Sequence, residues 1–273
     1  MRKILSIFGT WVLALTISSL SQAENVTVEN DNLKLHVEVD GAVGMPPLLL
    51  WNGGQTTTRM WDLTISRLEA HFRVIRFDVR GVGLSDANPP DVPYSMEQYA
   101  ADANAILDAF GIDKVNVWSM AWGSRAAIIH AALYPERVSL LALYDVSVDP
   151  ADTDAQAKGR ALALKKQEKE GIPIIEWPEN WNFHKNPDEA HKAMLAIQLF
   201  DDLEGQLNKI HVSTLISTGE YDPNLSSSKK MAKKMIDAEL NIMKNVGHGS
   251  VLQRPDLTVD NFLDFALDRV DVK

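Results

Sequence analysis

The chain has 273 residues, of which 45% are hydrophobic, and its formal net charge is −10. This size and composition are typical of a globular protein with one full hydrophobic core. The negative charge argues against nucleic acid as a partner, because phosphate binding requires a basic surface. The sequence contains no cysteine, which excludes disulfides, thiolate metal sites and a cysteine nucleophile.

The first 23 residues have the pattern of a signal peptide. Residues 1–3 (Met-Arg-Lys) give a basic start, residues 4–20 are apolar and uncharged, and residues 21–23 (Ser-Gln-Ala) have small side chains at the two positions that a signal peptidase recognises. A retained membrane anchor is the alternative, but the apolar stretch is short for a span and contains several Ser, Thr and Gly residues. Cleavage would leave an exported protein, periplasmic or secreted, without membrane insertion. Its charge would be −12, because Arg2 and Lys3 leave with the leader.

Strands and helices are predicted to alternate after the leader. Residues 25–39 alternate apolar and polar side chains, which predicts an antiparallel hairpin. Continuous apolar runs follow, which predict strands buried on both faces. Between them, one helical face groups Trp61 with Ile65 and Leu68, and another helix begins with the capping pattern Ser95-x-x-Gln98. This order predicts an α/β fold with a mostly parallel sheet and helices on both faces. The predicted buried strands are 48–51, 74–77, 115–118, 140–144 and 212–217.

The alternation stops between residues 148 and 208, where the sequence becomes charged and helical in pattern. We predict a helical cap here, inserted after the sixth strand, which divides the core into residues 24–147 and 209–273. Its aromatic side chains either form a small core of the cap or contact the substrate. The candidate substrate-binding residues are Trp177, Trp181 and Phe183, and Met194, Ile197 and Phe200 follow on one side of a later helix.

Residues 117–123 (Val-Trp-Ser-Met-Ala-Trp-Gly) have the pattern of the strained strand-to-helix turn on which many hydrolases carry their nucleophile. The frame is Ser119-x-Ala121-x-Gly123, so the nucleophile position is alanine. Ser119 and Ser124 occupy flanking positions, and their hydroxyls are expected to point away from a substrate carbonyl. The chain therefore lacks the side chain that a covalent acyl-enzyme requires.

Four separate patches resemble the α/β-hydrolase family. Residues 50–54 (Leu-Trp-Asn-Gly-Gly) are similar to its oxyanion loop, with Asn52 where histidine is more usual, and residues 78–85 (Asp-Val-Arg-Gly-Val-Gly-Leu-Ser) are similar to its D-x-R-G-x-G-x-S turn. The elbow and its ending at 134–138 are the third patch, and the segments ending at Asp222 and His248 are the fourth. The resemblance covers nearly all of the chain after the leader. It implies a sheet of roughly eight strands.

The resemblance also implies the composition of an active site. In the family's order of nucleophile, acid and base, this chain supplies Ala121, Asp222 and His248. The oxyanion donors would be the backbone N–H groups of Gly54 and Trp122. Backbone donors do not depend on the missing hydroxyl. The site should therefore still polarise a carbonyl, with His248 oriented by Asp222.

Alternatives remain for both titratable residues. His248 could be an ordinary surface-loop histidine, and Asp222 could cap the helix that follows it. Asp145, at the end of the sixth predicted strand, is a reserve acid, because some family members take their acid from that place. The other histidines show no metal-ligand spacing, so we predict no metal site and no cofactor.

Two classes of function follow, together with one trivial explanation. In the first, the protein is an enzyme acting on a small, largely apolar ester, lactone or activated carbonyl compound, with His248 as general base. In the second, it is an inactive relative that binds or senses a small hydrophobic ligand. The trivial explanation is that Ala121 was introduced in place of serine, although the retained leader argues against a laboratory variant. We favour the first class.

Overall fold

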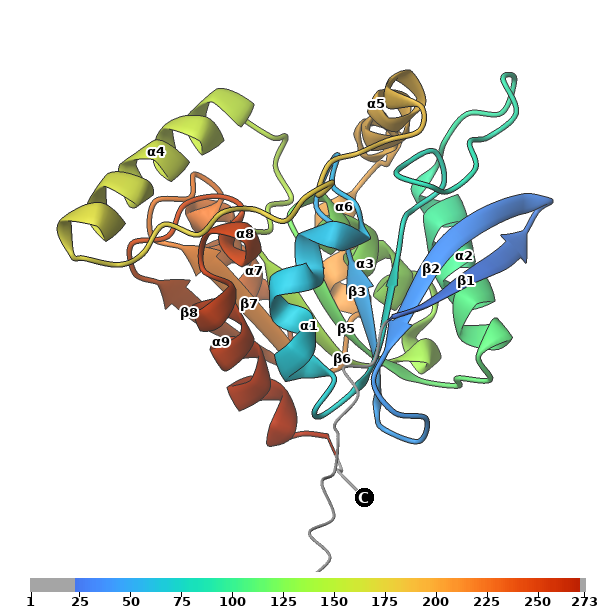
Figure 1. The fold of residues 1–273 in the computed structure, drawn as a ribbon, viewed down its shortest axis with the longest axis horizontal. Coiled ribbons are helices and arrows are strands. Elements are labelled where there is room, and N and C mark those ends of the chain that lie inside the picture. The colour runs from blue at the N-terminus through green and yellow to red at the C-terminus, as the bar shows by residue number, and fades with distance from the viewer. Residues whose placement is uncertain (1–22, 271–273) are drawn as a thin grey trace, which may run out of the picture.

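The protein is represented by a computed structural model that describes residues 23–270 (Figure 1). The predicted signal peptide lies outside this range except for Ala23. Among the described residues, no helix combines the length and the apolar character needed to cross a membrane.

A single sheet of eight strands forms the centre of the molecule, in the order β1-β2-β4-β3-β5-β6-β7-β8. The β1–β2 and β2–β4 pairs are antiparallel, and every pair from β4 to β8 is parallel. The predicted fold class is therefore confirmed, including the hairpin before the first buried strand. The strands are β1 (Glu24–Asn30), β2 (Leu33–Asp40), β3 (Pro47–Trp51), β4 (Arg73–Phe77), β5 (Val115–Met120), β6 (Val138–Tyr144), β7 (Thr214–Gly219) and β8 (Ala238–Met243).

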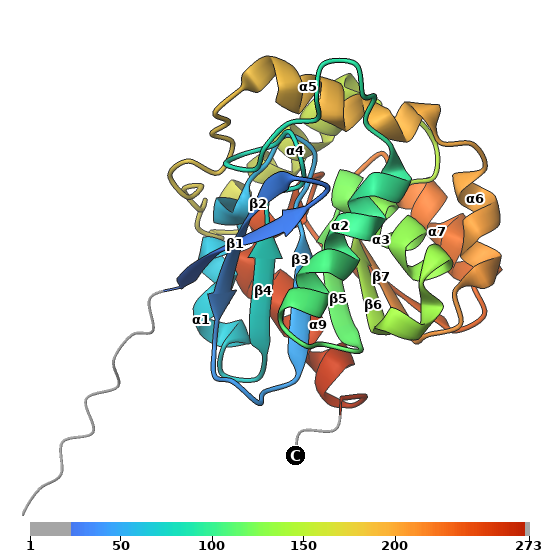
Figure 2. The same cartoon turned by 90° about the vertical axis from the view of Figure 1, so that its right-hand side faces the viewer.

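Helices cover both faces of this sheet. Helices α1 and α9 lie on one face, and α2, α3 and α7 lie on the other (Figures 1 and 2). The helix bounds are α1 (Asp62–Leu68), α2 (Met96–Ala109), α3 (Trp122–Leu133), α4 (Thr153–Lys169), α5 (Pro187–Leu195), α6 (Leu203–Gln206), α7 (Leu225–Lys234), α8 (Ser250–Gln253) and α9 (Pro255–Leu267). Short 3-10 turns are η1 (Thr58–Trp61), η2 (Pro135–Arg137), η3 (Ala196–Leu199) and η4 (Leu207–Lys209).

The capping pattern before α2 forms as predicted. The Gln98 backbone N–H donates to Ser95 Oγ at 3.3 Å, and the Ser95 N–H donates to Gln98 Oε1 at 3.0 Å. These two bonds satisfy donors that a helix N-terminus otherwise leaves without partners. The apolar face of α2, which includes Tyr99, Ala103 and Ile106, is fully buried against the sheet.

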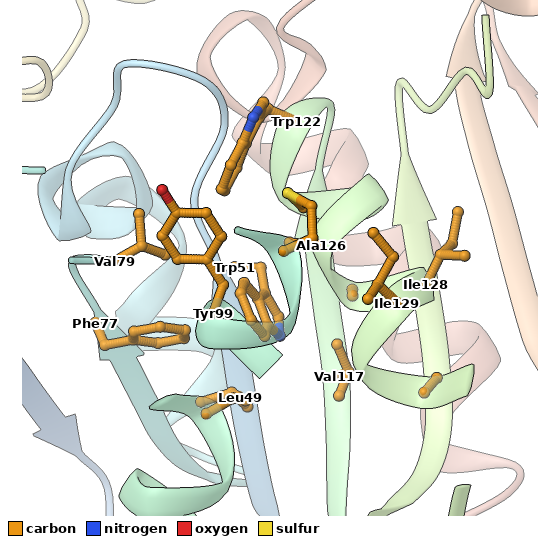
Figure 3. Packing of buried hydrophobic residues seen from close by; sticks show 14 of the residues in the cluster. Leu49, Trp51, Phe77, Val79, Tyr99, Val117, Trp122, Ala126, Ile128 and Ile129 are labelled. Carbon is orange, nitrogen blue, oxygen red and sulfur yellow. The ribbon is translucent and has the colours of Figure 1, made fainter. Parts of the chain in front are cut away.

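Aromatic side chains pack on both sides of the strand-to-helix turn between β5 and α3. On the face shown in Figure 3, the Tyr99 ring meets the Trp122 ring edge-on, with centroids 5.2 Å apart. On the opposite face, Trp118 stacks on Phe262 with centroids 4.6 Å apart. Residues just before and just after the turn are thus anchored in separate core layers. This packing fixes the turn from both sides.

The β6–β7 segment, residues 145–213, contains α4, α5 and α6 and lies across the end of the sheet where the parallel strands finish (Figure 2). Residues 171–186, all within the described range, contain no helix, so the predicted helical character holds for the two ends of this segment and not for its middle. Helix α4 ends at Lys169 and Gly171 has φ +70°, in keeping with the predicted stop. The division into core and cap at 147/148 and 208/209 remains a prediction.

Candidate active site

Ala121 occupies a strained backbone conformation on the turn between β5 and α3, with φ 52° and ψ −109°. A non-glycine residue here costs on the order of 1–3 kcal/mol and persists only where its surroundings enforce it. Gly123 shows the enforcement: a Cβ at this position would lie 2.2 Å from the Asn52 carbonyl oxygen, so α3 rests directly on the end of β3. The Ala121 N–H also donates to the Tyr144 carbonyl at 2.7 Å. The turn therefore has the backbone geometry of a nucleophile elbow but carries the side chain of alanine.

Neither neighbouring serine takes the place of a nucleophile. Ser119 Oγ donates to the Ala142 carbonyl at 2.8 Å, and Ser124 Oγ donates to the Tyr144 carbonyl at 3.0 Å. Both residues are fully buried. Their hydroxyls therefore tie the elbow to β6, in agreement with the expectation that they point away from a substrate.

Asp222 and His248 meet because β7 and β8 are parallel neighbours whose carboxyl ends lie at the same edge of the sheet. The His248 Nδ1 and Asp222 Oδ2 atoms are 2.9 Å apart. The other oxygen, Asp222 Oδ1, accepts the Asn224 N–H at 2.9 Å, so the carboxylate holds its own turn as well as the imidazole. A proton on Nδ1 leaves Nε2 of His248 as the basic nitrogen.

The surroundings of His248 favour its charged form. Burial opposes a charge on the ring, but the hydrogen bond to Asp222 and the charge of that carboxylate outweigh it and raise the pKa of His248 above its ordinary 6.5. A buried base with a raised pKa is suited to accept a proton during a reaction.

We expect the activity of the protein to follow the protonation of this histidine. General-base catalysis requires neutral imidazole, so kcat should increase as pH rises through a value above 6.5. Asp222→Asn removes the carboxylate that raises the pKa of His248. The rise of kcat with pH should therefore occur at lower pH, while kcat itself falls. A pH–rate profile of both proteins checks this. An unchanged midpoint in the variant would contradict the assignment of Asp222 as the partner.

Asp145, the reserve candidate for the catalytic acid, has a different role in the structure. Its Oδ2 atom accepts the backbone N–H groups of Gly249 at 2.9 Å and Ser250 at 2.7 Å, so it holds the loop after His248 and not the imidazole. Burial, followed by the charge of Asp222, raises the pKa of Asp145 to about 7. The ligand atoms of Asp145, Asp222 and His248 lie within 4.8 Å of one another, a grouping that the sequence spacing does not reveal. The absence of a metal site remains a prediction.

A cavity of about 1050 Å³ opens beside the elbow and beneath the β6–β7 segment. Ala121, His248, Gly54 and Trp122 all line it. A Cβ at Gly54 would lie 3.3 Å from Trp122 Cβ, so the two expected oxyanion residues are adjacent. Trp122 is the first residue of α3, where an N–H has no carbonyl four residues earlier within the helix and points toward the helix start. These positions suit stabilisation of a developing oxyanion.

The β6–β7 segment contributes both apolar and polar side chains to the cavity wall, and the apolar ones include a cluster on its later helices. Met194, Ile197 and Phe200 line it, as does Leu203. Trp122 fastens this wall, because its Nε1 donates to the Met194 carbonyl at 3.0 Å. The sequence analysis missed three buried polar residues that line the cavity; one of them could have been found from its position one helical turn after Ala121. These residues are Arg125, Gln156 and Asn224.

The candidate substrate-binding aromatics lie elsewhere. The Trp177 and Trp181 rings meet edge-on with centroids 4.7 Å apart and pack against the core layer that contains Trp118. The Trp181 carbonyl accepts the Thr57 N–H at 2.8 Å. Phe183 is 53% exposed. The wall of the cavity beside Ala121 is formed by other side chains than these three aromatics.

The D-x-R-G-x-G-x-S turn and the unusual Asn52 are structural. Asp78 accepts the N–H groups of Thr58 at 2.9 Å and Leu84 at 3.0 Å, and burial raises its pKa to about 6. Asn52 donates to the Phe77 carbonyl at 2.9 Å and accepts Trp61 Nε1–H at 2.9 Å. Asn52 thus binds the start of the oxyanion loop to the end of β4.

Comparisons with known proteins agree with this architecture. A family model described as alpha/beta hydrolase fold matches residues 46–173. Epoxide hydrolase 4 of Mus musculus is 30% identical over 116 residues, 42% of this chain, and the chain spans only 32% of that protein. The poly(3-hydroxyalkanoate) depolymerase of Ectopseudomonas oleovorans is 27% identical over 260 residues, which cover 88% of this chain and 91% of that protein.

The fold is shared with solved structures over most of its length. The crystal structure of the enol-lactonase from Burkholderia xenovorans LB400 is similar with a TM-score of 0.73 and 24% sequence identity. The match covers 89% of this chain and 100% of that one. With the matched family model, the eight-stranded sheet and the elbow between β5 and α3, this shows that the chain has the α/β-hydrolase fold.

Proposed function

We propose that the protein hydrolyses a small, largely apolar ester, lactone or similarly activated carbonyl compound without a covalent intermediate. The observation that carries this proposal is the His248–Asp222 pair on the wall of the cavity that also contains Ala121. The apolar wall formed by Met194, Ile197 and Phe200 supports the substrate class. The names of the related depolymerase and enol-lactonase point in the same direction.

In the proposed reaction, His248 Nε2 removes a proton from a water molecule as the water oxygen attacks the carbonyl carbon. The carbonyl oxygen becomes an oxyanion and accepts hydrogen bonds from the Gly54 and Trp122 N–H groups. The carbon–oxygen bond to the leaving group then breaks, and the imidazolium returns its proton to that oxygen. The products are a carboxylic acid and an alcohol, and Ala121 takes part in no bond.

His248→Ala should reduce kcat/KM on short-chain 4-nitrophenyl esters by about 10² to 10⁴-fold, because general acid–base catalysis contributes factors of that size. His211→Ala is the matched control, since His211 is exposed and lies outside the cavity. Ser124→Ala tests for an unnoticed nucleophile and should lower the rate far less than His248→Ala does, because the Ser124 hydroxyl only ties the elbow to β6. Measured steady-state rates for the four proteins decide the matter. Equal rates in the protein and its His248→Ala variant would refute the proposal.

Ala121 itself favours a second function, ligand binding without turnover. α/β-Hydrolases carry their nucleophile at this position, and alanine cannot form a covalent intermediate. In this alternative the protein binds a small hydrophobic ligand in the same cavity and releases it unchanged. Absence of turnover in the unmodified protein, together with ligand binding that survives His248→Ala, would establish it.

We also propose that the protein is exported to the periplasm or the medium. The support is the basic, apolar and small-residue pattern of residues 1–23. Cell fractionation, with N-terminal sequencing of the recovered protein, tests this; a protein that keeps its first residues and stays in the cytoplasm would refute it.

A further inference from the structure

Arg125 is a buried cation on the wall of the cavity, one helical turn after Ala121. Only 8% of the residue is exposed, and burial lowers the pKa of its guanidinium. Its Nε atom donates to the Ser147 carbonyl at 2.8 Å, and Nη2 donates to the Asp149 carbonyl at 2.5 Å. Both partners are neutral carbonyls on the loop after β6. They orient the guanidinium but leave its charge without a counterion.

The remaining guanidinium nitrogen, Nη1, has no hydrogen-bond partner among residues 23–270. It is also not among the fully buried polar atoms without partners, so it keeps contact with solvent, and Arg125 lines the cavity. Gln156, on α4, lines the same cavity and is only 9% exposed, and its side-chain amide likewise has no partner within the described chain. Two buried polar side chains from different elements thus line one cavity.

We propose that Arg125 binds a carboxylate of the substrate, assisted by the Gln156 amide. An uncompensated buried charge is costly, and a ligand carboxylate would supply both the counterion and a charge-assisted hydrogen bond. The inference rests on the proposed function for its reaction: the substrate is then a half-ester or a lactone acid, with the scissile carbonyl at Ala121 and an anionic end at Arg125. Arg125 lies one helical turn after Ala121 on the same cavity wall, which makes short half-esters suitable probes.

The acidic residues near the cavity do not oppose this arrangement. Asp149, Asp202 and Glu204 line it, but all three are exposed. Of these three carboxylates, that of Asp149 acts on the pKa of Arg125. It lies beyond the 4.0 Å within which two charged groups form an ion pair. Charges in contact with water are screened, whereas a buried charge acts at low effective dielectric. The electrostatic energy of a ligand carboxylate beside Arg125 therefore depends mainly on the buried cation.

The experiment compares two ligands that differ in one negative charge, monomethyl glutarate and dimethyl glutarate. Calorimetric binding to the His248→Ala variant avoids turnover, so the outcome does not depend on the proposed reaction. We expect the monoester to bind about tenfold to a hundredfold more tightly, as for a hydrogen bond to a charged group. Arg125→Gln should abolish this preference and leave dimethyl glutarate binding unchanged, while Arg125→Lys should keep part of it. The corresponding succinate and adipate esters test the spacing.

Equal binding of the two glutarate esters overturns the inference before any variant of Arg125 is made, so a variant that fails to fold does not obscure the result. Equal weakening of both ligands by Arg125→Gln also overturns it, because Arg125 would then only hold the loop at Ser147 and Asp149. If the preference is found and the unmodified protein hydrolyses neither ester, Arg125 keeps its role and the proposed function fails. If the unmodified protein hydrolyses the esters but binds both equally, the proposed function stands and the role of Arg125 fails.

Discussion

Ala121→Ser should give the protein a covalent acyl-enzyme and raise its kcat/KM on 4-nitrophenyl butyrate by about 10³-fold. Removing the nucleophile of a serine protease lowers kcat by about 10⁶-fold, and we expect a serine placed in a site that has not been selected to use one to recover about half of this factor on a logarithmic scale. The physical reason is that Ala121 already has φ 52° and ψ −109°, so a serine needs no change of backbone to present its Oγ to the cavity. His248 lies on that cavity with its Nδ1 bonded to Asp222.

The measurement is a burst of 4-nitrophenol together with mass spectrometry of the quenched protein, which should show one added butyryl group. The control is Ala121→Ser combined with His248→Ala, in which the serine has no base and should not be acylated. A folded Ala121→Ser protein without burst or adduct would show that the base or the oxyanion donors are misplaced. If the unmodified protein turns over through His248 and serine adds little, the natural mechanism never needed the covalent step.

The elements of the site that depend on chain order could be predicted from the sequence. Asp222 and His248 each follow an apolar run, and in a parallel sheet the ends of such strands lie at one edge. The alanine at the elbow was likewise predictable, because the small residues and the helix ending fix the register of the turn. These inferences need only the order of strands and the direction in which they run.

The cavity wall could not be predicted in the same way. Residues 171–186 form an irregular segment, and no periodicity in the sequence says which surface such a segment lies against. For Trp177 and Trp181 the sequence therefore favoured a core of the cap but left substrate contact open. Arg125 was missed because a lone arginine on an apolar helix has no motif; only the course of the chain after β6 shows that its partners are carbonyls.

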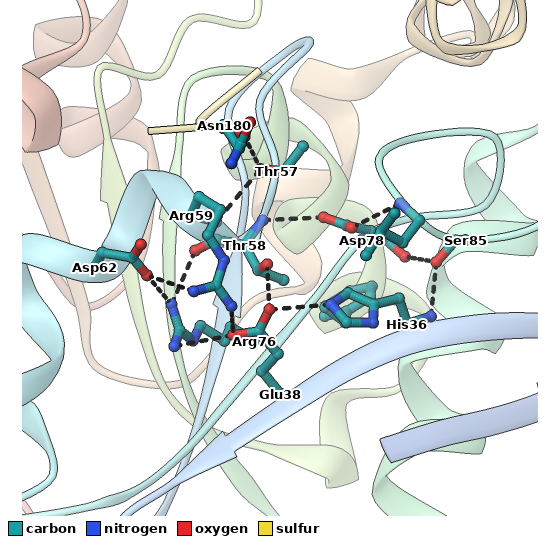
Figure 4. Close-up of polar contacts among 12 residues, drawn as sticks. His36, Glu38, Thr57, Thr58, Arg59, Asp62, Arg76, Asp78, Ser85 and Asn180 are labelled. Carbon is teal, nitrogen blue, oxygen red and sulfur yellow. Dashed lines mark hydrogen bonds and ion pairs between the residues drawn. The ribbon is translucent and has the colours of Figure 1, made fainter. Parts of the chain in front are cut away.

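Glu38→Gln should destabilise the protein by about 3 kcal/mol at pH 7, because it removes one of the carboxylates that compensate Arg76 and Arg59 in a buried network, while Asp40 and Asp62 remain (Figure 4). Glu38 is 1% exposed, and its carboxylate pairs with Arg76 at 2.9 Å and with Arg59. It also accepts Thr58 Oγ1–H at 2.9 Å. Urea unfolding measures the change. The exposed pair of Arg67 and Asp260 supplies the control, since Asp260→Asn should cost less than about 1 kcal/mol.

The lowered pKa of Glu38 predicts how the free energy of unfolding depends on pH. Burial acts to raise the pKa of Glu38, but the hydrogen bond to His36 and the charges of Arg76 and Arg59 lower it from 4.5 to about 2. A carboxyl whose pKa is lower in the folded state stabilises the protein fully above the unfolded value of 4.5. This contribution, about 3.5 kcal/mol at about 1.4 kcal/mol per pKa unit, is lost as pH falls through the window from 4.5 to 2.

The stability difference between the protein and its Glu38→Gln variant should therefore shrink between pH 5 and pH 3. Comparing the two proteins at each pH separates this effect from Asp78 and Asp145. Their raised pKa values of about 6 and 7 act in the opposite direction, stabilising the fold as pH falls. A difference that stays constant over this range would mean that the Glu38 carboxylate is not held in its charged form by the arginines.

The network also connects the stability of the fold to the candidate site. Thr58, which bonds Glu38 through its hydroxyl, donates its N–H to Asp78 and begins the turn that follows the oxyanion loop. Gly54 lies four residues before it. Glu38→Gln is therefore expected to lower kcat more than it raises KM, even at temperatures where the variant is fully folded, because a displaced N–H weakens binding of the transition state more than of the ground state. Unchanged kcat in the folded variant would show that the loop keeps its position without this buried charge.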